Sequence, residues 1–142
     1  DVIVQDQILS VLKRLRRELD LSVVFISHDI AVVADMCQRI GVMYAGQLVE
    51  FGRREEVFQD PAHPYTQRLL ASYPTLAGSK GTLVPLNGEG PERVESASGC
   101  RFLLRCGDAD ASCQTGIPQW IERSATHRVF CCREPETPSP GR

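Results

Sequence analysis

The sequence predicts an α/β protein in which one domain is only partly present and a small cysteine-rich extension follows it. Between residues 1 and 60, segments with the apolar spacing of amphipathic helices alternate with short runs of β-branched and aromatic residues, which is the pattern of an α/β layer. Five of the six cysteines lie after residue 99. The two ends of the chain are therefore expected to be built differently.

The first expected element is a helix from Val4, because apolar residues recur every three to four positions from there to Leu19. Leu21 to Ile26 is apolar on both alternating faces, which predicts a strand buried on both sides in a parallel sheet. One or two strands leave most of such a sheet unpaired. Partner strands are therefore expected outside this sequence.

Helical spacing returns at Ile30, with Asp29 placed as the N-cap that accepts the free amide hydrogens of the first turn. Residues 39–44 and 47–51 predict two strands joined by a tight turn at Ala45 and Gly46. A short helix is expected near residues 54–58. These elements complete the predicted first part of the chain, residues 1–60.

The second part, residues 61–142, opens with a helix that begins at Pro64 and is stopped by Pro74. Glycine, proline, serine and glutamate dominate from about residue 75 to 98, which predicts a linker. A cysteine module at residues 99–132 follows. The closing "REPETPSPGR" is typical of a frayed tail.

Composition excludes several classes of protein. The net charge of -2 and the pI near 5.9 give no basic footprint for nucleic acid. No apolar run approaches the roughly 20 residues that span a bilayer, and the first residues lack the pattern of a signal peptide. The sequence alone thus predicts a soluble, cytoplasmic protein.

Ser27 and His28 would lie at the carboxyl end of the first strand, where open α/β sheets bind their ligands. An imidazole there can donate a hydrogen bond to a bound phosphate and sense its presence. A purely structural histidine is the alternative. Ser27, His28 and Asp29 are not expected to form a catalytic triad, because three consecutive residues cannot converge in one line of hydrogen bonds.

Cys100, Cys106, Cys113 and Cys131 are separated by five, six and seventeen residues. Four thiolates gathered by loops suit an iron-sulfur cluster or zinc, and the absence of close C-x-x-C pairs speaks against the commonest zinc sites. A zinc site of three cysteines and His127, or free thiols, are the alternatives. Trp120 and Phe130 are expected to pack around the metal, with an aromatic platform for a peptide as the other interpretation.

Three stretches carry a family resemblance: "DVIVQDQILSVLKRL", "LSVVFISHDIAVVADMCQRIGVMYAGQLVEFG" and "HPYTQRLLASYP". Together they resemble the C-terminal part of an ATP-binding subunit of the oligopeptide and dipeptide ABC transporters. The resemblance implies that Asp1 is the aspartate of the D-loop and that His28 is the switch histidine that contacts the ATP γ-phosphate. It also implies ATP with Mg²⁺ as the cofactors of the full-length subunit, which would be an ATP hydrolase.

The sequence lacks a G-x-x-x-x-G-K-[ST] phosphate loop, the Q-loop, the signature sequence and the catalytic glutamate of this family. We therefore expect a fragment that neither binds nor hydrolyses ATP by itself. Some family members hold a four-iron four-sulfur cluster in a similar tail, which "GCRFLLRC" and "HRVFCC" resemble. That resemblance favours Cys131 over Cys132 as the fourth ligand, although Arg101, Leu103, Leu104 and Gly107 depart from the usual residues.

The leading functional hypothesis is therefore the ATPase subunit of a peptide importer, peripheral on the cytoplasmic face of the inner membrane. Its implied partners are a second ATP-binding subunit, two membrane-spanning permease subunits and an extracytoplasmic solute-binding protein, with no nucleic acid. The alternative hypothesis is a stand-alone regulatory module that binds zinc or an iron-sulfur cluster and has no ATPase activity.

Overall fold

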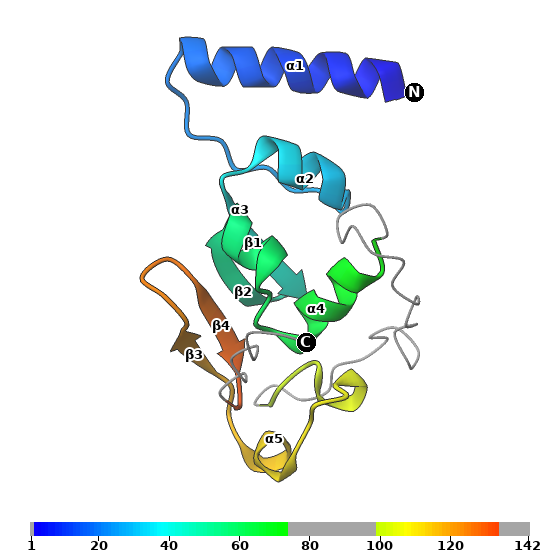
Figure 1. The fold of residues 1–142 in the computed structure, drawn as a ribbon, viewed down its shortest axis with the longest axis vertical. Helices are drawn as coiled ribbons and strands as arrows, with labels where there is room; N and C mark the ends of the chain where they lie inside the picture. Colours follow the sequence, from blue (N-terminus) through cyan, green and yellow to red (C-terminus); the bar gives the residue numbers. More distant parts are fainter. Residues whose placement is uncertain (1, 74–98, 134–142) are drawn as a thin grey trace. The chain divides into compact units, whose positions relative to one another are not determined.

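The structure is a computed structural model that describes residues 2–73 and 99–133 (Figure 1). It divides into two compact units, Asp1–Gln38 and Arg39–Arg142. Asp1, Pro74, the predicted linker at residues 75–98 and all but the first residue of the predicted frayed tail lie outside the described residues. In the described ranges, no helix is long and apolar enough to span a membrane.

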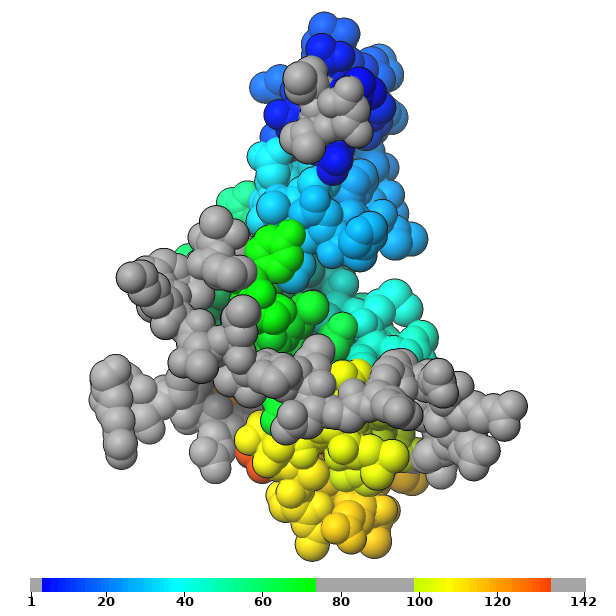
Figure 2. All heavy atoms as spheres, turned by 90° about the vertical axis from the view of Figure 1, so that its right-hand side faces the viewer, coloured from blue at the N-terminus to red at the C-terminus, as the bar shows by residue number. Residues whose placement is uncertain are grey.

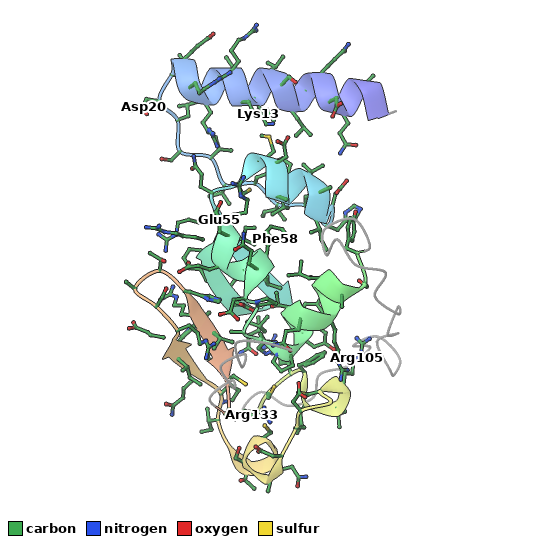
Figure 3. The ribbon with its side chains drawn as sticks, in the orientation of Figure 1. Lys13, Asp20, Glu55, Phe58, Arg105 and Arg133 are labelled. Atoms are coloured by element: carbon green, nitrogen blue, oxygen red, sulfur yellow. The ribbon has the colours of Figure 1, made fainter. Side chains whose placement is uncertain are left out.

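The first unit contains helices α1 (Val2–Glu18) and α2 (Ile30–Met36). The Asp29 side chain accepts hydrogen bonds from the backbone N–H groups of Ala31 and Val32, which confirms the predicted N-cap. Lys13 of α1 forms an ion pair with Asp35 of α2, and Figure 3 shows Lys13 on the side of α1 that faces α2. These contacts connect the two helices of this unit.

The strand predicted at Leu21 to Ile26 is not formed in the structure. This segment is extended but irregular, and the side chains of Val24 and Ile26 are 90% and 92% exposed. A strand is stable only when its backbone groups pair with a neighbouring strand, and none of the described strands pairs with this segment. Its apolar sequence therefore remains without the sheet that it was predicted to join.

The second unit opens with the predicted hairpin, β1 (Arg39–Tyr44) and β2 (Gln47–Arg53). Ala45 and Gly46 connect the strands in a two-residue turn, with φ angles of 48° and 77°. Positive φ at both turn residues is the geometry that matches the twist of paired strands, and Gly46 adopts it without steric cost. The turn prediction is thereby confirmed.

Two later strands, β3 (Gln119–Glu122) and β4 (Arg128–Cys131), complete a four-stranded sheet in the order β1-β2-β4-β3. Every pair in it is antiparallel, so the described sheet is not the parallel one expected from the sequence. β2 pairs directly with β4, which joins the hairpin to the cysteine module. The compact units divide after Gln38, and the domain boundary predicted at residue 60 stays a prediction.

Two helices follow β2, in agreement with the sequence: α3 (Arg54–Gln59) and α4 (Pro64–Ala71). Val57 of α3 is 1% exposed and packs beside Gly52 on the inner face of the sheet. A Cβ atom at Gly52 would lie 2.9 Å from the His127 ring, so this close approach requires glycine. Helix α3 and the His127 imidazole therefore pack closely against the inner face of the sheet.

The segment before β3 contains a short 3₁₀ helix, η1 (Leu103–Arg105), and helix α5 (Ala111–Thr115). Phe102 is 1% exposed, and its ring contacts those of Tyr44, Tyr65 and His63. The Arg68 guanidinium of α4 also donates a hydrogen bond to the carbonyl of Arg105. Figure 2 shows the yellow atoms of this segment beside those of α4, in green. The cysteine module is thus part of the second unit's core.

Candidate functional site

His28 lies in the loop immediately before α2, and its side chain is exposed. The neighbouring Ser27 Oγ accepts a hydrogen bond of 3.0 Å from the backbone N–H of Asp29, which in turn caps α2. Within the described residues, the imidazole itself makes no hydrogen bond or ion pair. The local fold therefore holds the backbone on either side of His28 and leaves its ring nitrogens accessible.

The predicted setting of His28 is only partly found. The capped helix that follows it is present, but the strand expected to end just before it is not. Asp1, the second predicted nucleotide-contacting residue, lies outside the described residues. Whether these two residues lie close together is therefore not tested by the described part of the chain, and their roles stay predictions.

The carboxylate of Glu50, on β2, is the most deeply buried charged group among the described residues, with 0% exposure. Its Oε1 accepts a hydrogen bond of 2.8 Å from the Ala62 N–H, and Oε2 accepts one of 2.9 Å from the His63 N–H. The Nε2 atom of His127 lies 2.7 Å from Oε1. One carboxylate therefore connects the sheet, the loop before α4 and the segment that leads into β4.

These contacts explain how a charged side chain is tolerated in the core. An unpaired buried carboxylate would be strongly destabilising, but charge-assisted hydrogen bonds from N–H donors replace the water that it has lost. Glu50 acts as a fixed acceptor that positions the chain at Ala62 and His63. We interpret it as a structural site that holds the second unit together.

His63 opens the His-Pro-Tyr stretch, and the structure assigns it a capping role. Its Nδ1 accepts a hydrogen bond of 3.0 Å from the Tyr65 N–H, and Pro64 occupies the first turn of α4. Burial lowers the pKa of His63 to about 4. The imidazole is consequently neutral near pH 7, which is the state in which Nδ1 can accept this hydrogen bond.

Sequence reasoning missed Glu50 and the structural role of His127. The available signal was a single acidic residue between the apolar residues Val49 and Phe51. A charge at such a position needs a buried partner, but the sequence alone does not say which donor supplies it. His127 had been considered as a zinc ligand, whereas in the structure Glu50 engages its Nε2 atom.

The four predicted cysteine ligands come from separate elements of the second unit. Cys100 precedes η1, Cys106 ends it, Cys113 lies in α5 and Cys131 ends β4. Their thiols are free. Burial raises the pKa of the Cys100 thiol, with smaller contributions from the neighbouring Cys131 and Cys113 thiols. The folded chain thus gathers at least these three sulfur atoms into one electrostatic neighbourhood.

Cys106 and Cys132 belong to the same neighbourhood. Burial raises the pKa of Cys106, and the thiols of Cys100 and Cys113 add to that effect. Burial and the neighbouring thiols raise the pKa of Cys132 to about 11. In this arrangement the protonated thiol is favoured at Cys132, whereas metal ligation requires thiolates.

The described side chains are not arranged as a metal centre. Across residues 2–73 and 99–133, no three side chains of cysteine, histidine, aspartate or glutamate are grouped so that they could hold a metal ion. The iron-sulfur and zinc hypotheses therefore receive no support from the side-chain geometry. Trp120 is 39% exposed, and its ring centroid lies 5.3 Å from that of Phe130, the other aromatic residue expected to pack in this module.

Comparison with known proteins identifies the region that contains Glu50 and His63. Residues 49–113 match the family described as "Oligopeptide/dipeptide transporter, C-terminal region". This range includes most of β2, both following helices and three of the four predicted cysteine ligands. This match covers just under half of the chain.

Individual relatives extend the similarity over nearly the whole chain. The dipeptide transport ATP-binding protein DppD of Bacillus subtilis (strain 168) is 40% identical over 131 residues, which are 92% of this chain and 39% of that protein. The oligopeptide transport ATP-binding protein OppD of the same organism is 43% identical over 130 residues, which are 91% of this chain and 36% of that protein. A putative peptide import ATP-binding protein of Brucella abortus (strain 2308) is 46% identical over 113 residues, with coverages of 80% and 34%.

These matches support the predicted resemblance to the C-terminal part of an ATP-binding protein of the oligopeptide and dipeptide ABC transporters. The chain spans less than two fifths of the length of these three relatives.

Proposed function

We propose that the chain is the C-terminal part of an ATPase subunit that powers peptide import across the cytoplasmic membrane. The observation that carries this proposal is the similarity of about nine tenths of the chain to dipeptide and oligopeptide transport ATP-binding proteins. In the whole subunit, ATP and Mg²⁺ would bind at a phosphate loop that residues 1–142 do not contain. We expect these residues alone to have no ATPase activity.

Within this function, His28 would contact the γ-phosphate of ATP. What supports this role is the exposure of its imidazole and its position next to the Asp29 cap. Phosphoryl transfer is catalysed mainly by positioning and by stabilisation of developing negative charge. An imidazole N–H that donates to a γ-phosphate oxygen provides both, and Asp1 would act beside it as the D-loop aspartate.

The Glu50 network would hold the hairpin, the loop before α4 and the cysteine module together within the second unit. Glu50 joins β2 to His63 on one side and to His127 on the other. Because all three groups are buried, movement of the loop before α4 or of β4 would break charge-assisted hydrogen bonds. This network supports a second unit that moves as one body during the transport cycle.

A finer proposal is that Cys100, Cys106, Cys113 and Cys131 bind a four-iron four-sulfur cluster, or alternatively zinc. What supports it is the electrostatic neighbourhood of the thiols and the preference of both metals for sulfur ligands. The described side chains do not form a ligand group, so the thiols would have to move closer together.

The partners proposed for the whole subunit are a second ATP-binding subunit, two permease subunits and an extracytoplasmic solute-binding protein. The subunit would lie peripherally on the cytoplasmic face of the inner membrane. The names of the relatives, which are transport and import ATP-binding proteins, support this assembly.

The proposal can be tested by transplanting the segment. Residues 1–142 would replace the matching C-terminal part of the Bacillus subtilis dipeptide transport protein, which is 40% identical. We expect the chimera to restore dipeptide uptake to a strain that lacks this protein, whereas a version truncated before residue 1 would not. A stably folded chimera that hydrolyses no ATP and restores no uptake would contradict the proposal and favour a separate regulatory module.

A further inference from the structure

The outer face of the four-stranded sheet carries an unusual combination of side chains. Strand alternation directs Ile40, Val42 and Val129 inward, and the register places the residues next to them on the opposite face. We define the arginine–aromatic row as four of these outer residues, one from each strand in sheet order: Arg39, Phe51, Arg128 and Trp120.

The row is continuous across the sheet. The guanidinium carbon of Arg39 lies 4.6 Å from the Phe51 ring centroid, and that of Arg128 lies 5.4 Å from the same centroid. Arg128 is also 4.8 Å from the Trp120 ring, whose centroid is 5.3 Å from that of Phe130. Each of these distances is within the range of cation–π or aromatic contact.

Charge on this face is unbalanced. The register sets Arg53 directly opposite Arg39, and like charges opposite one another destabilise a sheet. Glu122, opposite Arg128, is the acidic residue that the described strands place on the same face. In the described ranges neither Arg39 nor Arg128 forms an ion pair with a carboxylate. A chain of net charge -2 therefore concentrates three arginines and one glutamate on one side of a sheet.

The stacked arginines are arranged to bind anions. A guanidinium that lies over a ring uses its face for that contact, and its N–H edges stay free for bidentate hydrogen bonds to a carboxylate. The two guanidinium carbons flank one ring, so they are no more than about 10 Å apart. Alternate side chains of an extended peptide are spaced about 7 Å apart. Two flexible carboxylate side chains at that spacing can therefore reach both guanidinium groups.

We propose that the arginine–aromatic row is a docking surface for an acidic, extended segment of a partner protein. Two carboxylates of that segment pair with Arg39 and Arg128, and an apolar side chain between or beside them contacts the exposed ring of Trp120. Nucleic acid is the less favoured occupant, because three arginines in a chain of net negative charge offer few phosphate contacts. This inference does not depend on the proposed ATPase function.

Trp120 is the single tryptophan of the chain, so its fluorescence reports directly on the row. The full chain, residues 1–142, would be titrated with a short synthetic peptide in which glutamate alternates with threonine around a central leucine. We expect saturable binding that changes the Trp120 emission and weakens with added salt. The same peptide with glutamine in place of glutamate should not bind.

The variant Arg39→Gln/Arg128→Gln should weaken binding of the acidic peptide about tenfold or more, because two charge-assisted contacts are removed. Arg17→Gln, an exposed arginine of α1 outside the row, is the matched control and should bind like the unmodified chain. Circular dichroism would establish that all variants are folded. Equal binding of the glutamine peptide, or equal binding by the double variant, would overturn the proposal. Tighter binding of an oligonucleotide or of anionic vesicles that requires the same two arginines would also overturn it.

Discussion

Replacement of Glu50 by leucine should severely destabilise the second unit. The change removes the acceptor for the Ala62 and His63 N–H groups and leaves His127 Nε2 without its partner. Each buried donor left without a hydrogen bond costs about 1–3 kcal/mol, and loss of one member of a buried charged network typically costs about 3–5 kcal/mol. We expect the free energy of unfolding to fall by about 3 kcal/mol or more. This is a large part of the roughly 5–15 kcal/mol that stabilises a small domain.

Urea unfolding of the full chain, followed by Trp120 fluorescence and by circular dichroism, measures this loss. Glu50→Gln keeps the side-chain volume and one carbonyl acceptor, so it should destabilise by about 1–3 kcal/mol and remain measurable if the leucine variant does not fold. Glu122→Gln on the outer face of β3 is the matched control and should change the free energy of unfolding by less than about 0.5 kcal/mol. If the free energy of unfolding of Glu50→Leu lies within roughly 1 kcal/mol of that of the control, the reasoning about the buried network is wrong.

Two further predictions concern His63 and the cysteines. Because burial lowers the pKa of His63 to about 4, the unfolded chain binds this proton more tightly, so stability should fall by up to about 3 kcal/mol as the pH drops from 6.5 to 4. His63→Asn, which keeps a capping acceptor for the Tyr65 N–H, should remove that part of the pH dependence in urea titrations, and an unchanged dependence would exclude His63 as its source. If the cysteine proposal is correct, anaerobic reconstitution with iron and sulfide should give a brown protein whose colour is lost in Cys113→Ser and mostly kept in Cys132→Ser. A colourless protein with one stoichiometric zinc would favour the alternative metal, and a protein free of both metals would contradict the two versions together.

The local elements were largely predictable, because each has a signal within a few residues. Asp29 marks the start of α2, Ala45 and Gly46 mark the hairpin turn, and Pro64 marks the first turn of α4. Capping, positive φ and a fixed proline ring all act over a distance of one helical turn or less. A sequence therefore displays them directly.

Features that depend on distant partners were not predictable in the same way. Leu21 to Ile26 has the composition of a buried strand, but a strand forms only where another strand pairs with it. The pairing of β2 with β4 joins residues almost eighty positions apart, and no short-range pattern encodes that register.

The candidate sites show the same division. His28 was recognised from a motif, and its local setting beside the Asp29 cap follows from adjacent residues. Glu50 was missed because its partners, Ala62, His63 and His127, lie far along the chain. The outer face of the sheet likewise became visible only when the register placed Arg39, Phe51 and Arg128 side by side.

The role of His28 is the most direct test of the proposed function. In the chimera with the dipeptide transport protein, His28→Ala should lower the rate of ATP hydrolysis about a hundredfold, as expected for loss of one preorganised hydrogen-bond donor, and should leave nucleotide binding nearly unchanged. Ser10→Ala, an exposed change on α1, is the control for folding and should keep normal turnover. Unchanged ATP hydrolysis by a folded His28→Ala chimera would contradict the assignment of this histidine to the γ-phosphate.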